Sequence, residues 1–581
     1  MLNPAQAEAL PHVFARDENL LVVAPTGAGK TVIGMAAALR TVVQQGRKSA
    51  WLVPQRSLTD ELDRELAGWR DHGLRVERLS GEHTVDIDRI HRADLWVATT
   101  EKFEAICRAS AFREALADVG SLVVDEIHML GDAARGPVLE ALLARVRDGG
   151  TPARIVGLSA TIANAEQVAG WLRATLLPIT WRPGRLSWQL PAIPANPDFT
   201  VTEAARTRLA SAITALVTQD GGSVLVFCGS KRNVRRTALV IAASRGADVL
   251  VATSTVAAGV NLPARAVVVQ DTQVGLETLD VGTVQQMFGR AGRIGVGEDQ
   301  GWAFMIVDEH ERAGWQARMV AGHTVSSRIK ASLPEQLLSE AVQQLVSSQR
   351  QAEQWWVQTL AYHQGHRSLR PLSRGIQFLV SAGMLTASPA RSGDVGLSPT
   401  ELGRLTARLM VSPVICDGLR HALARLLAAR GHVGPRGRPV SAAGPGGASQ
   451  RGDLARAALL AVANSPEAFR PGVRQIGGIP YGAVYPILEE VPRYLHWLAS
   501  QGLFGTVHPW CAIVAADLER RPSSPPRPQV RQEPRYSPGA ATTALPAGWP
   551  HTPRYRADLK SAPHQCAAVC LAAGQRRPRG G

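Results

Sequence analysis

Eight residues near the start of the chain have the types and spacing that grip a polyphosphate. They read APTGAGKT at residues 24–31 and follow the apolar run 20–23. In such a loop, glycines let backbone N–H groups close around phosphate oxygens, a lysine reaches the outer oxygens and a threonine hydroxyl holds Mg²⁺. Only six of the 64 Lys and Arg residues are lysines, so a lysine at this position is informative. The sequence predicts that a nucleoside triphosphate and Mg²⁺ bind to Thr26, Gly27, Ala28, Gly29, Lys30 and Thr31.

Two adjacent carboxylates follow a later apolar run, SLVVD. Asp125 and Glu126 stand at the carboxyl end of this expected strand, where side chains face the nucleotide crevice of an open α/β sheet. Asp125 would hold Mg²⁺ together with Thr31, and Glu126 would position or deprotonate the attacking water, because phosphoryl transfer needs mainly positioning and charge neutralisation. A pair of carboxylates alone is common, whereas the tetrad DEIH at 125–128 is more specific.

A glycine- and arginine-rich segment, QMFGRAGR at 286–293, is the third candidate. As a helix, it would present Arg290 and Arg293 three residues apart on one face. Two arginines there would reach the γ-phosphate from across a domain interface. They would neutralise the negative charge that builds up as the bond to the γ-phosphate breaks. Gly289 and Gly292 favour this role over a pair of solvated arginines, because an exposed helix gains nothing from the conformational cost of glycine.

The elements that position these residues alternate between strand and helix through the first 310 residues, as in parallel sheets with helical crossovers. Apolar runs predict the strands of a first unit, ending near Thr180, at LLVVA, AWLV, LWVA, SLVVD and RIVGL. A connector at 181–186 leads to a second unit at 200–312, with strands at 224–227, 249–252, 267–269 and 303–307. Residues 320–430 become helical and contain a winged helix around GIQFLVSAGMLTASPARSGDVGLSPTELGRL.

Composition limits the partners. A net charge of +15 favours polyanions, nucleic acid first, although 11 Lys and Arg against two acidic residues beyond residue 519 place nine of those charges in the tail. The tail also holds 11 of the 37 prolines and is expected to be disordered. Six scattered cysteines make no disulfide framework, and no apolar run approaches the ~18 residues that span a bilayer. We expect a cytoplasmic protein without a membrane partner.

The order of these signals resembles superfamily II helicases, in the DExH branch that contains the Ski-type and archaeal repair helicases. The resemblance covers residues 2–310 and rests on LNPAQAEAL, APTGAGKT, VPQRSL, TTEKF, DEIH, SAT, VLVFCGSK, VATSTVAAGVNLPA and QMFGRAGR. It implies an ATP-dependent helicase or translocase that works as a monomer and moves 3′ to 5′ on single-stranded or partly duplex DNA, in repair or recombination. An RNA helicase is the nearest alternative, because contacts to the backbone do not distinguish the two sugars.

The resemblance also assigns roles to single residues. Gln6 would read the adenine edge, beside the ATP and Mg²⁺ site of Lys30, Thr31, Asp125 and Glu126. The residues that couple this site to strand movement would be Ser159, Thr161 and Gln286. Those that grip the nucleic-acid backbone would be Pro54, Arg56, Thr100 and Thr253, with simple loop packing as the alternative for each. In the last helices Arg493 and Trp497 share a face and would brace single-stranded bases, although a tryptophan at this spacing is more often a core residue.

In one respect the chain departs from the family. Only one helix, KRNVRRTALVIAASRG, fits between the strands at 224–227 and 249–252, where family members place another strand and further helices. A crossover of this length is sufficient, since ~12 residues return a parallel strand. Loss of an interior strand could nevertheless displace 281–293 and leave both arginines out of reach. A nucleic-acid-binding protein with a crippled ATPase is therefore a third possible function. The stretch VVVQDTQVGLETLDVGTV is also short for a strand-separating hairpin.

The predicted fold class is α/β, with two RecA-like parallel-sheet domains followed by a winged helix and a helical domain. The ATP-binding domain would span 1–190 and the shortened second RecA-like domain 191–315. The later parts would be a winged-helix region at 316–430, a linker at 431–451, a ratchet-like helical domain at 452–519 and a basic, proline-rich disordered tail at 520–581.

Overall fold

The computed structural model describes two compact units. The described residues are 2–421 without 16, 55, 80–86, 109–111, 149–152, 183, 195, 244–247, 254–263, 276, 293–299, 390–393 and 419, together with 475–476, 479–480, 497 and 569–570. Unit 1 comprises Met1–Ile329, Gln358–His366 and Pro553–Gly581, and unit 2 comprises Lys330–Val357 and Arg367–Thr552. The predicted linker, ratchet-like domain and tail lie almost entirely outside the described residues. In the described part of the chain, no helix is long and apolar enough to cross a membrane.

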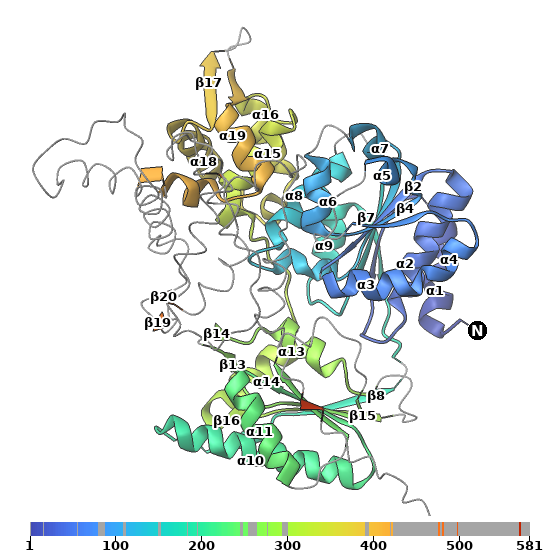
Figure 1. Ribbon diagram of the computed structural model, residues 1–581, viewed down its shortest axis with the longest axis vertical. Coiled ribbons are helices and arrows are strands. Elements are labelled where there is room, and N and C mark those ends of the chain that lie inside the picture. Colours follow the sequence, from blue (N-terminus) through green and yellow to red (C-terminus); the bar gives the residue numbers. More distant parts are fainter. Residues whose placement is uncertain are drawn as a thin grey trace, which may run out of the picture. The chain divides into compact units, whose positions relative to one another are not determined.

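Seven parallel strands form the first sheet of unit 1, in the order β3-β4-β2-β5-β6-β1-β7 (Figure 1). Along the chain they are β1 (Asn19–Val23), β2 (Lys48–Val53), β3 (Val76–Leu79), β4 (Leu95–Thr99), β5 (Val119–Val124), β6 (Arg154–Ser159) and β7 (Ala174–Pro178). All five strands predicted from apolar runs are present. The two that were not predicted, β3 and β7, are the edges, where partial exposure removes the continuous apolar run of a buried parallel strand.

Helices cover both faces of this sheet because successive strand residues point to opposite sides. In β1, Leu21 and Val23 belong to one apolar core, and Leu20 and Val22 belong to the other. The first core is completed by α6 (Thr100–Cys107), α8 (Gly136–Asp148) and α9 (Ala165–Leu172), and the second by α1 (Pro4–Ala15), α2 (Lys30–Leu39) and α3 (Arg56–Glu65). Shorter helical segments are η1 (Arg40–Gln44), α4 (Ala67–Asp71), α5 (Ile87–Arg92), α7 (Arg113–Ala117) and η3 (Ile127–Gly131).

The second sheet of unit 1 has the order β21-β11-β10-β12-β15-β8. Its strands are β8 (Arg185–Gln189), β10 (Val224–Cys228), β11 (Val249–Thr253), β12 (Ala266–Val269), β15 (Gln300–Met305) and β21 (Val569–Cys570), all parallel except β21. β8 begins inside the segment expected to be a connector and precedes the domain boundary expected at residue 190. It joins the sheet by pairing with β15, a long-range contact that local propensity does not reveal.

A single helix, α11 (Lys231–Ala243), joins β10 to β11, as the sequence indicated. The other helical segments are α10 (Phe199–Gln219), α13 (Val281–Phe288), η4 (Glu309–Glu311) and α14 (Arg312–Ala321). Two small ladders complete the domain, one between β9 (Ala192–Ile193) and β16 (Val307–Asp308) and one between β13 (Gln273–Val274) and β14 (Glu277–Thr278). The β13–β14 hairpin directly before α13 is therefore only two residues deep on each side.

Unit 2 begins within η5 (Ile329–Ser332) and includes the segment for which a winged helix is predicted. Its helices are α15 (Leu333–Val342), α16 (Gln349–Gln358), α18 (Arg370–Ser381) and α19 (Glu401–Leu409), whereas α17 (Leu360–His363) belongs to unit 1. Between α18 and α19, β17 (Leu385–Pro389) and β18 (Val395–Pro399) pair in antiparallel fashion, and the winged helix stays a prediction. A further short ladder joins β19 (Gln475–Ile476) to β20 (Ile479–Pro480).

Candidate functional site

The phosphate loop connects the end of β1 to the start of α2. Gly27 and Gly29 have φ values of +88° and +82°, which glycine adopts without strain. Gly29 is the N-cap of α2 and Lys30 is its first residue, so the N-terminal N–H groups and the dipole of α2 open on this loop, an arrangement that suits a phosphate. A Cβ atom at Gly29 would lie 2.5 Å from Gln6 Nε2. The loop therefore requires glycine at this position.

Contacts from Lys30 and from α1 hold the loop in shape. Lys30 Nζ donates to the carbonyl oxygen of Ala24 at 2.9 Å. Asn3 Nδ2 donates to the carbonyl oxygen of Ala28 at 3.1 Å, while Asn3 and Gln6 exchange two backbone-to-side-chain hydrogen bonds that cap α1. Asn3 was not predicted as a site residue. An Asn followed three residues later by Gln is nevertheless a variant of the capping-box signal, which would have found it.

The two carboxylates follow β5 as predicted. Asp125 Oδ1 accepts a hydrogen bond from the backbone N–H of Glu126 at 2.9 Å. Burial, together with the neighbouring charge of Glu126, raises the pKa of Asp125 to about 7. A cation would offset the unfavourable burial of this carboxylate, and the oxygen donors of Thr31 and Asp125 are ligands that Mg²⁺ prefers. The residues present thus fit a magnesium ion.

His128 connects the carboxylates to α13. The residue is 6 % exposed, its Nε2 lies 2.8 Å from Gln286 Nε2, and its Nδ1 lies 3.3 Å from Glu126 Oε2. With the Gln286 amide nitrogen as donor, His128 Nε2 is the acceptor and the ring proton belongs on Nδ1, which lies near Glu126 without a hydrogen bond to a described atom. Burial lowers the pKa of His128, which favours this neutral ring. The structure therefore brings the predicted Gln286 to the DEIH segment, through a histidine that was not itself predicted.

The backbone after α13 reaches the phosphate loop. A Cβ atom at Gly289 would lie 2.7 Å from Thr26 Oγ1, so Gly289 touches Thr26 directly. The predicted helix through residue 293 is wrong, because α13 ends at Phe288 with Gly289 as its C-cap and Gly292 adopts a left-handed φ of +63°. Arg290 lies in a turn and not on a helix face. Arg293 lies outside the described residues.

Comparisons with known proteins agree with this geometry. The profile of the DEAD/DEAH box helicase family matches residues 3–168, and that of the helicase conserved C-terminal domain matches residues 205–295. The ATP-dependent DNA helicase Hel308 of Pyrobaculum calidifontis is 30 % identical over 497 residues, which cover 72 % of this chain and 69 % of that protein. The chain belongs to the DEAD/DEAH-box helicases. The family predicted from the motifs is confirmed.

Two further relatives of this helicase are also named ATP-dependent DNA helicase Hel308. The protein of Pyrococcus abyssi is 31 % identical over 357 residues, which cover 50 % of this chain and 49 % of the relative. The protein of Thermoplasma volcanium is 29 % identical over 462 residues, which cover 69 % of this chain and 66 % of the relative. The chain thus spans between half and about two thirds of the length of these two relatives.

Two of the helicase's predicted coupling residues lie at the end of β6, where Ser159 is the last strand residue and Thr161 comes shortly after it. Ser159 is fully buried, and its carbonyl oxygen accepts from the backbone N–H of Ala24, at the start of the phosphate loop, at 3.1 Å. Among the described atoms its hydroxyl has no hydrogen-bond partner. Thr161 is exposed. Ser159 therefore contacts the nucleotide loop through its backbone, while the coupling role of both side chains stays a prediction.

The predicted grip residues lie at the ends of strands. Pro54 follows β2, and its carbonyl oxygen accepts a hydrogen bond from Arg135. Thr100 is 8 % exposed at the start of α6, and Thr253 is half-buried at the end of β11. Arg56 is the first residue of α3, and its side chain lies outside the described part. Their contacts to nucleic acid stay predictions.

Trp497 is placed as a core residue of unit 2. Its side chain is fully buried, and Nε1 donates to Thr406 Oγ1 at 2.7 Å. This contact favours the core alternative over direct stacking on bases, since stacking needs an exposed ring face. Arg493 lies outside the described residues.

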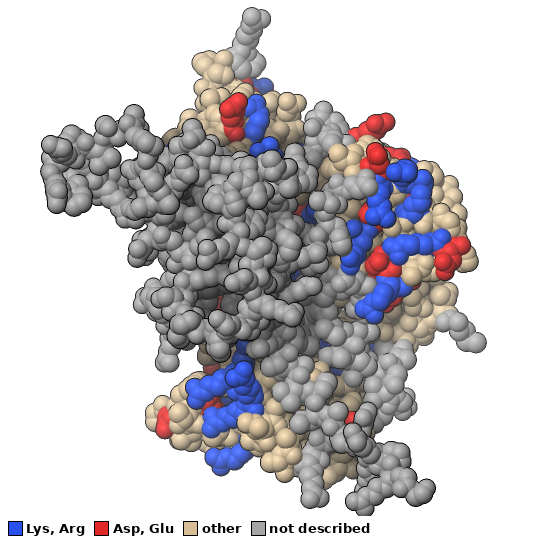
Figure 2. Space-filling view, in the orientation of Figure 1, with Lys and Arg blue, Asp and Glu red and all other residues tan. Residues whose placement is uncertain are grey.

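Basic side chains gather on the second-sheet domain. Figure 2 shows them over the region of α10, α11 and α14. α11 begins with KRNVRR, in which Lys231, Arg232 and Arg235 are exposed. Glu203 lies 3.1 Å from Arg236 and 3.6 Å from Arg232, which compensates part of the charge. The remaining positive charge favours a polyanion in this region.

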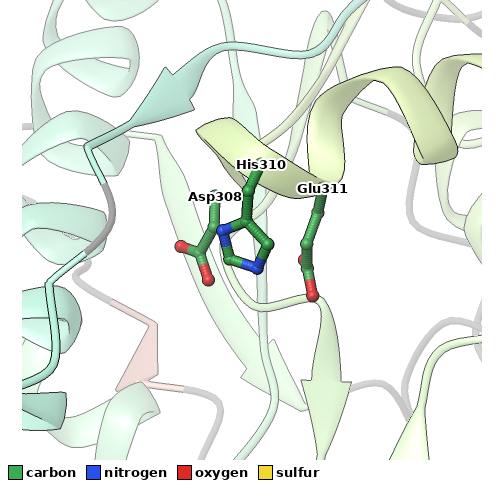
Figure 3. A group of neighbouring side chains, drawn as sticks. All are labelled: Asp308, His310 and Glu311. Carbon is green, nitrogen blue, oxygen red and sulfur yellow. The ribbon is translucent and has the colours of Figure 1, made fainter.

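Another cluster of residues of metal-binding types lies directly before α14, at the end of β16 and in η4. Figure 3 shows the His310 ring between the carboxylates of Asp308 and Glu311, and the ligand atoms all lie within 4.8 Å of one another. However, Asp308 Oδ1 accepts from Arg206 at 2.8 Å. Because the guanidinium charge already balances this carboxylate, we assign no metal to the cluster.

Proposed function

We propose that this helicase hydrolyses ATP with Mg²⁺ and uses the cycle to move 3′ to 5′ along a strand and to unwind duplex, with DNA favoured over RNA. The observation that carries the proposal is the double contact between the two sheet domains. Gly289 touches Thr26, and Gln286 lies against His128. A nucleotide-driven motor needs both domains to meet at the phosphates, so that binding and release change their contact.

Each group at the nucleotide then has one task. The loop N–H groups and Lys30 bind the phosphates, and Gln6 reads the adenine edge. Thr31 and Asp125 hold Mg²⁺, which when bound neutralises phosphate charge. Glu126 orients the attacking water, and the His128 ring packs beside its carboxylate, with Nδ1 3.3 Å from Oε2. Arg290, in the turn beyond Gly289, and Arg293 neutralise charge on the γ-phosphate.

On the strand side, the polar ends of both sheets would hold the backbone. Pro54, Arg56 and Thr100 grip from the first domain, Thr253 grips from the second, and Ser159, Thr161 and Gln286 couple the grip to the nucleotide. The preference for DNA is supported by the relatives, which are named as DNA helicases. Since the β13–β14 hairpin has only two residues in each strand, we propose that translocation is more efficient than duplex separation.

A nucleic-acid-binding protein with a crippled ATPase is the second candidate, because a single helix joins β10 to β11. This reading expects the segment after α13 to be displaced from the phosphate loop. The contact between Gly289 and Thr26 argues against it.

Strand-stimulated ATP hydrolysis tests the proposal. The full chain is assayed without nucleic acid, with single-stranded DNA and with single-stranded RNA, together with Lys30→Ala and Arg290→Ala. We expect stimulation mainly by DNA, loss of ATP binding in Lys30→Ala, and loss of turnover with retained binding in Arg290→Ala. Lys330→Ala removes an exposed lysine and is the matched control. If neither DNA nor RNA stimulates ATP hydrolysis, the proposal of a motor is refuted. Stronger stimulation by RNA than by DNA would favour an RNA helicase. The direction of movement is tested by unwinding of duplexes that carry a 3′ or a 5′ single-stranded tail.

A further inference from the structure

The segment 322–328, called here the strap, follows α14 and is fastened to the first-sheet domain. The backbone N–H of Ala163 donates to the carbonyl oxygen of His323 at 2.7 Å. Asn164 forms two hydrogen bonds with the backbone of Val325, donating at 2.8 Å and accepting at 2.9 Å. Val325 is fully buried in one of the two cores of the first sheet. The strap is thus tied to the residues that directly follow the SAT segment, 159–161.

His323 lies between the DEIH segment and α13. Its ring centroid is 6.1 Å from that of His128, with an angle of 81° between the ring planes. A Cβ atom at Gly131 would lie 3.7 Å from His323 Nε2, and one at Gly282 would lie 2.9 Å from His323 Nδ1. α13 can approach the ring only because residue 282 has no side chain. Gly282 is the second residue of α13, and a Cβ at this distance would force the ring or the first turn of the helix to shift.

We propose that His323 is a positioning residue for ATP hydrolysis. It packs edge-on against the His128 ring and holds Nδ1 toward Glu126 and Nε2 toward Gln286. The inference rests on the proposed function and adds a residue that acts through His128 without touching the nucleotide. An edge-to-face ring contact restricts rotation of the buried imidazole. Without His323 the ring has room to turn, and a turned ring cannot face both partners, as a catalytic constellation requires.

The first test observes the His128 ring itself and needs no turnover. The full chain is labelled with ¹⁵N at histidine, and the ring signals of His128 are assigned with His128→Gln. We expect the wild type to show predominantly the Nδ1–H tautomer, because the Gln286 amide donates to Nε2. His323→Ala should give a mixture of tautomers, and His323→Phe, which keeps a ring edge, should retain the single form. An unchanged His128 tautomer in His323→Ala would overturn the proposal.

The second test measures strand-stimulated ATP hydrolysis and nucleotide binding. His323→Ala should lower kcat on the order of tenfold with unchanged nucleotide affinity, and His323→Phe should recover most of the rate. His363→Ala is the matched control, because His363 packs near Gly170 and has no contact with His128 among the described residues.

A double-mutant cycle decides whether His323 acts through His128. His323→Ala should add no further loss in a His128→Ala background, and additive losses would overturn the proposal. If the wild type hydrolyses no ATP, the proposed function fails, and the tautomer comparison still decides the role of His323.

Discussion

Replacing Gly289 by alanine tests whether the second domain must touch the phosphate loop for turnover. The added Cβ would lie 2.7 Å from Thr26 Oγ1 and 2.8 Å from Thr26 Cβ, whereas ordinary contacts begin at 3.4 Å. The segment after α13 must therefore retreat by about 0.7 Å, the difference between 3.4 Å and 2.7 Å. Gly289 has a φ of −60° and a ψ of −13°, which alanine also adopts, so the substitution introduces no backbone strain.

This retreat moves Arg290, the next residue, away from the phosphates. Misplacement by about 1 Å can cost on the order of 100-fold in rate, so we expect Gly289→Ala to lower kcat by roughly 10-fold to 100-fold. Binding of ATP should be retained, because Lys30 and the glycines of the loop are unchanged.

The assay compares strand-stimulated ATP hydrolysis with equilibrium binding of a fluorescent ATP analogue. Gly314→Ala is the matched control, since a Cβ at Gly314 in α14 meets nothing within 4 Å. It should hydrolyse ATP at the wild-type rate. If Gly289→Ala does so as well, the contact between Gly289 and Thr26 plays no part in turnover, and the reasoning is refuted.

Three other substitutions have expected outcomes. Burial raises the pKa of Glu140 to about 7, from an ordinary 4.5. The folded state therefore keeps the Glu140 proton over a pH range in which the unfolded state loses it. The free energy of unfolding should accordingly fall by about 3 kcal/mol as pH rises from about 4.5 to 7. Glu140→Gln removes the titrating group and with it this pH dependence. The melting temperature of the variant, relative to that of the wild type, should therefore increase from pH 5 to pH 8. A difference in melting temperature that does not change with pH would contradict the assignment. Trp497→Phe leaves the Thr406 hydroxyl without its buried donor and should destabilise unit 2 by ~1–3 kcal/mol, whereas reduced strand-stimulated turnover at unchanged melting temperature would indicate a ratchet role. Asn3→Ala removes the cap of α1 and the bond to the Ala28 carbonyl, so we expect a loss of ~1 kcal/mol in stability and a higher KM for ATP; an unchanged KM would show that α1 does not shape the loop.

The interior of both sheets was predictable from the sequence and the edges were not. β1, β2, β4, β5 and β6 are buried on both faces and read as continuous apolar runs. β3, β7 and β8 are partly exposed edge strands, so polar and apolar residues are mixed along them and no continuous apolar run marks them. Pairing with a distant neighbour decides their conformation, and one sequence does not reveal that pairing.

The same distinction applies to the site. The phosphate loop was predictable because all its groups lie in eight consecutive residues, whose glycines adopt the left-handed backbone that the loop needs. The approach of His128 to Gln286 and to His323 joins residues more than 150 positions apart. The helix predicted beyond Phe288 failed for a local reason. α13 ends at Phe288, and Gly292 adopts a left-handed backbone that an α-helix excludes, which the arginine spacing does not indicate.

The strand order of the second sheet explains why the short connection between β10 and β11 does not displace the segment after α13. The shortened connection joins β10 to β11, whereas β12 and β15 lie on the other side of β10. The segment after α13 is held from that other side, where the backbone of Ala291 pairs with Ala264, directly before β12, and Gly292 packs on the Gly301 backbone of β15. Met287 and Phe288 are buried in the same core as β12. The short crossover to β11 is thus separated by β10 from the strands that fix Gly289. Substitutions in α11 that unsettle this crossover should therefore lower stability before they change the contact with Thr26.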